Sequence, residues 1–301
     1  MGRTKQVGEE MKQKILSESI SLGVSFHTLP RDDEDNKKAS IRDCCIAPEG
    51  YDFITADYKA MELRVLAHIS GDENMIKMFH SKVDPHIYTA SLVYEKDVSR
   101  ISKEERQIAK SGSFLIVYGG GAWKLSKTCN ISIPAAERTI EKLKEVYPGV
   151  FIWMDKIKAQ IYEEHKCKSL FGRIRNLPDI MSNVQKVKDK CIRQGVNFII
   201  QHSASVITCY AVVDIYNELK FRQLNSSIVG SVHDSIEVVS SKQDTEETLQ
   251  IMRNKMENYP LLRSLGYNFK VPICMDAEIG RSFSGGKKIE FSEKGSVLNY
   301  V

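Results

Sequence analysis

Two aspartates stand where carboxylates on neighbouring strands could hold divalent cations. Asp57 ends the alternating segment YDFITAD, and Asp234 lies between two β-rich runs in SSIVGSVHDSIEVV, which indicates a hairpin with an aspartate at its tip. Such a pair can hold two Mg²⁺ ions about 3.5 to 4 Å apart, one activating an attacking oxygen and one stabilising a leaving oxygen. Phosphoryl transfer requires such a clamp. The alternatives are a helix cap for Asp57 and ordinary turn chemistry for Asp234.

A second set of candidate residues follows one face of a predicted helix. Ser102 and Glu105 form a capping box, and the glycines after Tyr118 supply a stop, so we expect a helix of about four turns. Four side chains recur on it every four residues: Arg106, Lys110, Phe114 and Tyr118. The two cations could bind a triphosphate and the two aromatic rings could stack on a base. An amphipathic helix with surface cations and buried rings is the alternative.

A third set lies on the long helix predicted before the hairpin. Arg193, Asn197 and Gln201 are also four residues apart. Their side chains can donate hydrogen bonds to the minor-groove acceptors of every base pair, which predicts contacts with a duplex that do not depend on its sequence. A solvated helix face is the alternative.

Six segments, in order, resemble motifs of DNA polymerase family A. The segments are DYKAMELRVLAHISGD, ERQIAKSGSFLIVYGG, GRIRNLPDI, RQGVNFIIQHSAS, SVHDSIEV and VPICMDAEIGRSF, and the similarity runs from about Ile41 to Phe283. The resemblance implies template-directed DNA synthesis from deoxynucleotides, with two Mg²⁺ ions as cofactors. It implies an α+β fold in which an antiparallel-sheet palm receives a large helical fingers insertion.

The resemblance also implies roles for individual residues. It makes Asp57, the Tyr58 carbonyl and Asp234 metal ligands, and Glu62 the group that excludes a ribose 2′-hydroxyl. It adds His86 to the triphosphate-binding Arg106 and Lys110, with Lys110 as proton donor to the leaving pyrophosphate. The remaining roles are stacking on the nucleotide and template by Phe114 and Tyr118, and DNA contacts by Arg193, Asn197, Gln201 and His233.

The chain departs from the family pattern at several points. Ser235 stands where the family has Glu, and a hydroxyl is a poorer Mg²⁺ ligand than a carboxylate. Lys59 and Ala60 replace the usual Ser-Gln. Nothing before Ile41 resembles a thumb or an exonuclease domain, so we expect a fragment or a split polymerase whose thumb comes from a separate polypeptide. A single-subunit RNA polymerase, which Glu62 argues against, and a catalytically weakened DNA-binding subunit are the alternative functions.

The predicted elements begin and end with strands, with helices between. Strands are expected at Ile41 to Ile46, Tyr51 to Asp57, within Ser227 to Ser240, and near Lys270 to Ala277; helices are expected at about Ala60 to Ile69, through most of Asn74 to Asp189, from Asp189 to Leu219 and after Ser240. The corresponding domains are an N-terminal segment with the first part of the palm at 1–76, fingers at 77–190, and the second part of the palm at 191–301. The charged run from Arg31 to Lys38 is predicted to be a solvated loop.

Composition excludes some protein classes and leaves the partner open. Charged residues make up 27% of the 301 residues, and no apolar run approaches the ~20 residues of a membrane-spanning helix. A formal charge of +4 neither supports nor excludes a nucleic-acid partner. The seven cysteines form no CxxC pair, which favours reduced thiols, and the N-terminus has no signal-peptide core. A cytoplasmic protein is therefore expected.

Overall fold

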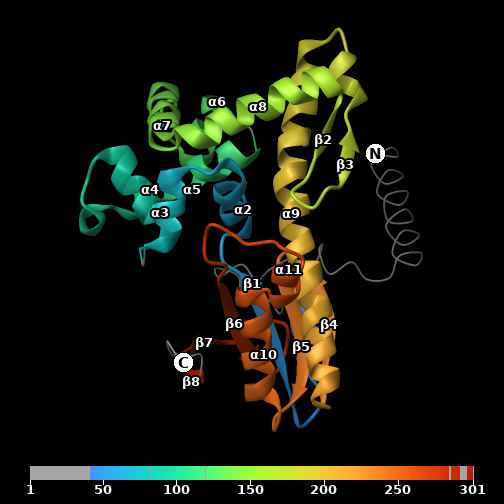
Figure 1. The fold of residues 1–301 in the computed structure, drawn as a ribbon. Helices are drawn as coiled ribbons and strands as arrows, with labels where there is room; N and C mark the ends of the chain where they lie inside the picture. The colour runs from blue at the N-terminus through green and yellow to red at the C-terminus, as the bar shows by residue number, and fades with distance from the viewer. Residues whose placement is uncertain (1–40, 82, 119, 285, 292–296, 301) are drawn as a thin grey trace, which may run out of the picture. The chain divides into compact units, whose positions relative to one another are not determined.

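The computed structural model describes residues 41–81, 83–118, 120–284, 286–291 and 297–300 (Figure 1). The chain divides into two compact units, each treated by itself below. Unit 1 comprises Met1–Asp57, Leu219–Gln250 and Ala277–Val301, and unit 2 comprises Tyr58–Glu218 and Ile251–Asp276. The palm and fingers boundaries given above refer to functional domains, which a division by contacts does not test, so they stay a prediction. The predicted loop from Arg31 to Lys38 lies outside the described residues.

The sheet has six strands in the order β4-β5-β1-β6-β7-β8. Their bounds are β1 (Tyr51–Tyr58), β4 (Ser226–Val232), β5 (Ser235–Ser241), β6 (Met275–Gly280), β7 (Lys287–Phe291) and β8 (Val297–Tyr300). The pairs β4–β5, β5–β1, β6–β7 and β7–β8 are antiparallel. Strands distant in sequence thus meet in one antiparallel sheet, and the predicted α+β class is confirmed.

Alternation along β1 and β5 gives the sheet one fully buried face. Ile54 and Ala56 on β1 and Ile236 and Val238 on β5 have no exposed surface. These β-branched and small apolar side chains fit a pleated surface covered by other elements. Within unit 1 the first turn of α10 (Thr245–Asn258) is tied to the sheet, because Thr248 shares a hydrogen bond of 2.8 Å with Ser226.

The sheet differs from the sequence prediction at four strands. The predicted strand from Ile41 to Ile46 is wrong: Ile41–Cys44 is a 3₁₀ helix, η2, and Ile46 makes an isolated bridge to Ser282. The strand expected from Lys270 begins at Met275, and β7 and β8 were not predicted.

Unit 2 is mainly helical, as predicted. Its helices are α2 (Met61–Ser70), α3 (Glu73–His80), α4 (Pro85–Tyr94), α5 (Lys103–Tyr118), α6 (Ala122–Cys129), α7 (Ile133–Val146), α8 (Pro148–Glu164), α11 (Pro260–Ser264) and most of α9 (Gln185–Phe221). Two short 3₁₀ helices, η3 (Val98–Arg100) and η4 (Pro178–Met181), interrupt the series. The predicted capping box is present, since Glu105 N–H donates to Ser102 Oγ at 3.1 Å and Ser102 N–H donates to Glu105 Oε2 at 3.0 Å.

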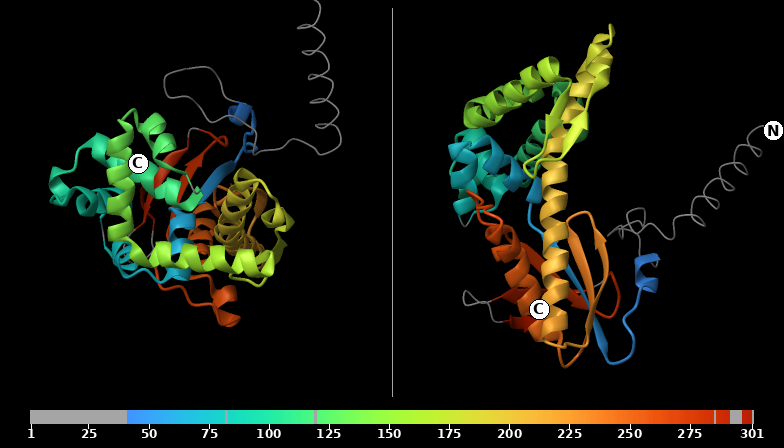
Figure 2. Two further views of the ribbon diagram at one scale, coloured as in Figure 1. Left: turned by 90° about the horizontal axis from the view of Figure 1, so that it is seen from above. Right: turned by 45° about the vertical axis from the view of Figure 1, so that its right-hand side comes forward.

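A two-stranded hairpin, missed by the sequence prediction, lies beside α9 (Figure 2). Its strands are β2 (Lys166–Lys168) and β3 (Ile174–Asn176). The Leu170 N–H donates to Ser203 Oγ on α9 at 3.2 Å, and the Cys167 thiol contacts the Gly195 carbonyl at 3.6 Å. The hairpin therefore extends the unit 2 core onto α9.

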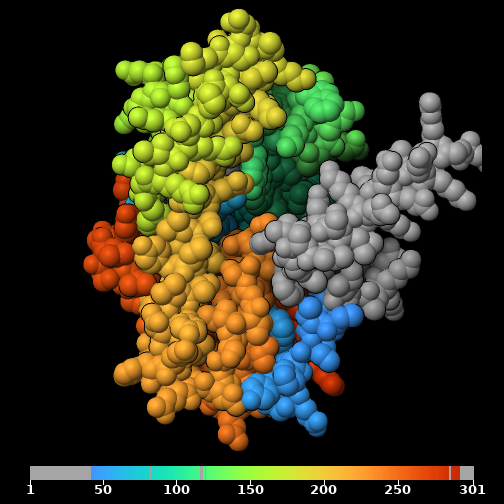
Figure 3. All heavy atoms as spheres, turned by 90° about the vertical axis from the view of Figure 1, so that its right-hand side faces the viewer, coloured from blue at the N-terminus to red at the C-terminus, as the bar shows by residue number. Residues whose placement is uncertain are grey.

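Among the described residues, α9 is long and apolar enough to cross a membrane by length and composition. A core helix passes the same test, and the buried side chains of α9 recur at intervals of a helical turn, including Ile200, Ile207, Ala211 and Ile215. Its other side lies on the surface (Figure 3). Residues buried on one side and exposed on the other fit a core helix, so α9 carries no argument for a membrane.

Candidate active site

The two predicted metal-binding aspartates stand at the same end of neighbouring strands in unit 1. Asp57 pairs directly with Ser235 across β1 and β5, and Ser235 pairs with Val232 to close the β4–β5 hairpin. The turn consists of His233 and Asp234, with His233 at a φ of 57° in the left-handed region that histidine tolerates better than most residues. Both aspartates are half-buried and His233 is exposed. Strand register and a tight turn therefore place the two aspartates at one end of the strands, and their joint binding of a metal stays a prediction.

The donor set fits a Mg²⁺ ion shared with a phosphate-bearing substrate. Carboxylate oxygens are the protein ligands that Mg²⁺ prefers, and it commonly uses one or two of them together with water and substrate phosphates. Within the described ranges, no group of three or more His, Cys, Asp or Glu side chains could form a cage. Asp57 and Asp234 would thus hold the ion, with the substrate completing its coordination.

The side chain of Tyr58 is buried in the core and is not part of the predicted metal site. The residue is 3% exposed, and its hydroxyl is buried with no hydrogen-bond partner among the described residues. Burial, and then the charge of Glu257, raise the pKa of the Tyr58 phenol far above its usual value. The side chain is therefore not a metal ligand, and the role predicted for the backbone carbonyl stays a prediction.

Arg106 on α5 is joined to the start of α4 within unit 2. Its guanidinium donates to both Asp84 oxygens, from Nε at 3.2 Å and from a terminal nitrogen at 2.8 Å. The same carboxylate caps α4 by accepting from the backbone N–H groups of His86 and Ile87, each at 2.9 Å. Burial raises the pKa of Asp84, but hydrogen bonds from Arg106 and Ile87 and the charge of Arg106 bring it below its usual value. Asp84 thus holds two elements of the predicted triphosphate site together.

His86 lies among the predicted triphosphate-binding cations. Its ring centroid is 6.2 Å from that of Phe114, and its Nδ1 is buried with no hydrogen-bond partner among the described residues. Burial, followed by the charges of Lys110 and Arg106, lowers the pKa of His86 to about 4 despite the opposing charge of Asp84. The imidazole is therefore neutral near pH 7 and can donate a hydrogen bond without adding a third positive charge.

Arg106, Lys110, Phe114 and Tyr118 form a stripe along one face of α5, and the aromatic end of this stripe is joined to Glu62. The Phe114 and Tyr118 rings stack with centroids 6.4 Å apart and planes inclined by 16°. The Tyr118 hydroxyl donates to Glu62 Oε2 on α2 at 2.6 Å. Unit 2 therefore brings together the residues predicted to bind the nucleotide: Glu62, His86, Arg106, Lys110, Phe114 and Tyr118.

The predicted duplex contacts lie on α9. Arg193 and Gln201 are exposed, and Asn197 is half-buried with its Oδ1 lacking a hydrogen-bond partner among the described residues. The helical spacing of the three residues is confirmed because 185–221 form one helix. Their contact with DNA stays a prediction.

Two acidic residues with evident roles were missed from the sequence. Asp84 precedes Pro85, a helix-start signal, but its partner Arg106 lies 22 residues away and nothing local indicates it. Glu237 is 3% exposed on β5, where the alternating pattern gave no reason to expect a buried carboxyl. Its surroundings are described below.

Comparisons with known proteins agree with this geometry. The family model described as DNA polymerase family A matches residues 25–285. The chain is 31% identical over 249 residues to a thermostable DNA polymerase I of Thermus filiformis, covering 82% of this chain and 29% of that protein. It is 33% identical over 240 residues to DNA polymerase I of Caldicellulosiruptor bescii, covering 80% of this chain and 27% of that protein.

A solved structure has a similar fold. It is the POL domain of Pol1 from M. smegmatis in complex with DNA primer-template and dNTP, with a TM-score of 0.79 and 28% identity, covering 87% of this chain and 45% of that chain. The chain thus spans less than a third of the length of the two bacterial relatives above. The family match nevertheless extends over most of its residues, and the chain belongs to DNA polymerase family A.

Proposed function

We propose that the chain catalyses template-directed DNA synthesis, transferring nucleotides from dNTPs to a primer 3′ end with two Mg²⁺ ions. The observation that carries the proposal is the register that pairs Asp57 with Ser235 and so brings Asp57 and Asp234 to one end of β1 and β5. Family membership and the cluster of cations and rings in unit 2 support it. Bound Mg²⁺ would supply electrostatic stabilisation of the attacking and leaving oxygens.

The groups around α5 are suited to a triphosphate. Arg106 and Lys110 place positive charge where a polyanion binds, and Lys110 can donate a proton to the departing pyrophosphate. The ion pair with Asp84 fixes the Arg106 guanidinium in position before nucleotide arrives. Neutral His86 adds a hydrogen-bond donor. In this proposal these residues bind and orient the triphosphate and stabilise the charge on its leaving part.

Glu62, Phe114 and Tyr118 would select the sugar and hold the base. The ring faces of Phe114 and Tyr118 can stack on a base of any sequence. The hydrogen bond from Tyr118 fixes the Glu62 carboxylate, which would then exclude a 2′-hydroxyl by its position. Arg193, Asn197 and Gln201 would contact the duplex, and His233 the primer end. Primer-template DNA and dNTPs are the proposed partners; a thumb-bearing polypeptide and a cytoplasmic location stay predictions.

Extension of a labelled primer on a defined template tests this function. The purified chain is incubated with Mg²⁺ and either dNTPs or rNTPs, alongside an Asp57→Asn variant. Template-dependent extension with dNTPs that is lost in the variant supports the proposal, and preferential use of rNTPs would indicate RNA synthesis instead. Binding of primer-template without extension would indicate a DNA-binding subunit, an alternative that Ser235 favours because it supplies no third carboxylate.

A further inference from the structure

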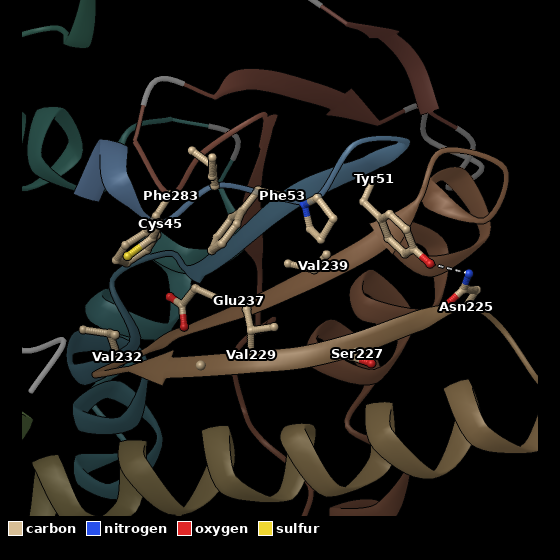
Figure 4. Close-up of a pocket in the computed structure, with 13 residues that line it drawn as sticks. Cys45, Tyr51, Phe53, Asn225, Ser227, Val229, Val232, Glu237, Val239 and Phe283 are labelled. Atoms are coloured by element: carbon tan, nitrogen blue, oxygen red, sulfur yellow. Dashed lines mark hydrogen bonds between the residues drawn. The ribbon is translucent and has the colours of Figure 1, made fainter. Parts of the chain in front are cut away.

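Glu237 is a buried acid that lines an apolar cavity in unit 1. The cavity has a volume of about 450 Å³, and its walls include Ile46, Phe53, Val229, Val239 and Phe283. Figure 4 shows the Glu237 carboxyl directed toward Val232, away from the hydrogen-bonded Tyr51 and Asn225. The residue is 3% exposed, and its Oε2 has no hydrogen-bond partner among the described residues. A buried carboxyl of this kind is costly and calls for a physical reason.

The contact of Glu237 with Ser235 links it to the turn that carries Asp234. The Ser235 hydroxyl lies between two acceptors, Glu237 Oε1 and the Val232 carbonyl, the latter at 2.9 Å. A hydroxyl has one proton and can donate to one of them at a time. If Glu237 is neutral, its own proton goes to Ser235 Oγ and the Ser235 proton goes to Val232. That arrangement satisfies both contacts and leaves no buried negative charge.

The neighbouring strand leaves space for the carboxyl. Gly230 pairs with Glu237 across β4 and β5, next to an irregularity in register between Ile228 and Gly230. A Cβ built on Gly230 would lie 3.0 Å from Glu237 Oε2, which is tighter than an ordinary contact. The absence of a side chain at 230 therefore allows the carboxyl to lie flat against β4.

Burial of Glu237 favours its neutral form, and the charge of Arg42 opposes this effect. Burial raises the pKa of Glu237, while the hydrogen bond that Ser235 would donate to the ionised carboxylate, the backbone hydrogen bond at Glu237 and the charge of Arg42 lower it, and the net shift is upward. Arg42 also stacks its guanidinium on the Phe283 ring at 4.7 Å from the centroid. These surroundings are compatible with a neutral acid that acts as a hydrogen-bond donor.

We propose that Glu237 is a positioning residue for Asp234: as a neutral acid it donates to Ser235 Oγ, and Ser235 donates to the Val232 carbonyl. This relay fixes the two-residue turn His233-Asp234 and so orients the aspartate opposite the end of β1. Its value for catalysis rests on the proposed polymerase function. Its effect on the turn does not.

The experiment compares Glu237→Gln with Glu237→Leu in the full chain. Gln is neutral and its amide can still donate to Ser235, whereas Leu fills similar space without a donor. Glu247→Gln, an exposed carboxyl paired with Arg222 on the same unit, is the matched control. The first readout is hydrogen–deuterium exchange of residues 229–237. We expect exchange at the turn to be faster in Glu237→Leu and unchanged in Glu237→Gln and in the control.

The second readout is Mn²⁺ affinity. It is measured from the electron paramagnetic resonance signal of free Mn²⁺, in the absence of DNA and nucleotide. Because residues that orient metal ligands typically affect affinity by roughly 10 to 100-fold, we expect a loss of about tenfold in Glu237→Leu and less than about twofold in Glu237→Gln. Ser235→Ala, which breaks the relay but keeps the acid, should resemble Glu237→Leu. Urea unfolding of each variant establishes that it is folded under the conditions of both readouts.

Two results would overturn the inference. If Glu237→Leu leaves turn exchange and Mn²⁺ affinity unchanged, Glu237 does not position Asp234. If Glu237→Gln is as defective as Glu237→Leu, an anion is needed and the neutral-donor relay is wrong. Hydrogen–deuterium exchange at the turn is measured without substrate, so it does not depend on the polymerase function. Failure of that function would appear separately, as absence of primer extension by the parent chain.

Discussion

Asp57 lies directly opposite Ser235 across β1 and β5, so the residue facing the first aspartate is the one that follows Asp234. The carboxylate of Asp234 therefore depends on the conformation of a two-residue turn rather than on strand pairing. His233, the other turn residue, has a φ of 57°, which most side chains tolerate poorly. The proposed metal-binding pair thus combines one residue in a regular strand with one whose position is set by a turn.

Replacing either aspartate by asparagine should abolish Mg²⁺-dependent primer extension while preserving the fold. Each substitution removes one of the charged oxygen ligands proposed for the reacting phosphate but keeps nearly the same side-chain shape. Asp276→Asn is the matched control, because that carboxylate is 55% exposed in a surface ion pair with Lys59, and such pairs contribute little stability. Single-turnover extension, with circular dichroism as a check on folding, measures the effect. Retention of more than a small fraction of the parent rate by either variant would contradict the two-aspartate mechanism.

Protonation of His86 should make the protein less stable in mild acid. The folded pKa of about 4 lies below the ordinary value of 6.5, so the unfolded chain takes up the proton first. The contribution of His86 is therefore fully present above about pH 6.5 and declines as the pH falls toward 4.

Urea unfolding at intervals from pH 7 to pH 4 tests this dependence. His86→Gln should show a shallower fall in unfolding free energy across that range than the parent. His80→Gln, at an exposed position, is the control and should retain the parent slope. Equal slopes in all three proteins would show that His86 is not held neutral by its surroundings.

The elements that could be predicted from sequence are those with a strong local pattern. Strand β1 alternates apolar and polar residues, and α5 begins at a capping box and ends at glycines. The β2–β3 hairpin has no such pattern, because its strands have three residues each and are mostly exposed. Ile41 to Ile46 has apolar spacing suited to a strand, but only Ile46 finds a pairing partner, at Ser282, and η2 forms instead.

Site residues could be predicted where the signal lay within one element. The spacing of Arg106, Lys110, Phe114 and Tyr118 follows from helical periodicity alone. Their partners come from other helices, such as Glu62 on α2, 56 residues before Tyr118. A sequence pattern cannot show that Glu62 accepts a bond from Tyr118, or that a carboxyl at 237 is buried beside Ser235, because both depend on tertiary packing.

Lys110 and Arg106 should affect different kinetic parameters. Lys110→Ala should lower the chemical step by roughly 10²-fold or more if it donates a proton to pyrophosphate. Arg106→Ala should mainly weaken dNTP binding, by roughly 10 to 100-fold for the loss of a charge-assisted hydrogen bond. Lys103→Ala, exposed in the first turn of the same helix, should change neither. Single-turnover rates over a range of dNTP concentrations separate the two effects. If neither the rate nor the dNTP affinity changes in either variant, the α5 stripe is only a solvated surface.

Gly195 should tolerate no side chain. A Cβ at this position in α9 would lie 2.5 Å from Ile161 Cδ1 and 2.8 Å from Leu177 Cδ1. Gly195→Ala gains about 1 kcal/mol of helix propensity but forces the core apart at a cost of about 1 to 3 kcal/mol, so we expect a net loss of unfolding free energy. Ile161→Val removes Cδ1 and should partly rescue the alanine variant. Purely additive effects in urea unfolding of the two single variants and the double variant would argue against the close contact.

Glu62 and Tyr118 should act together in excluding ribonucleotides. Glu62→Ala removes the carboxylate proposed to exclude the 2′-hydroxyl, so the ratio of dNTP to rNTP incorporation should fall most in this variant. Tyr118→Phe keeps the stacking ring but removes the hydroxyl that donates to Glu62 Oε2 at 2.6 Å. Because a hydrogen bond to a carboxylate is stronger than a neutral one, its loss should allow Glu62 to adopt other positions and lower selectivity by a smaller factor.

Competition between matched dNTP and rNTP on one template measures this ratio directly. Glu73→Ala, whose carboxylate is 86% exposed at the start of α3, is the control and should leave the ratio unchanged. The double variant of Glu62→Ala with Tyr118→Phe should be no less selective than Glu62→Ala alone, since the hydroxyl acts through the carboxylate. Additive losses would assign Tyr118 a role of its own at the sugar, and an unchanged ratio in Glu62→Ala would remove the carboxylate from the selection of the nucleotide.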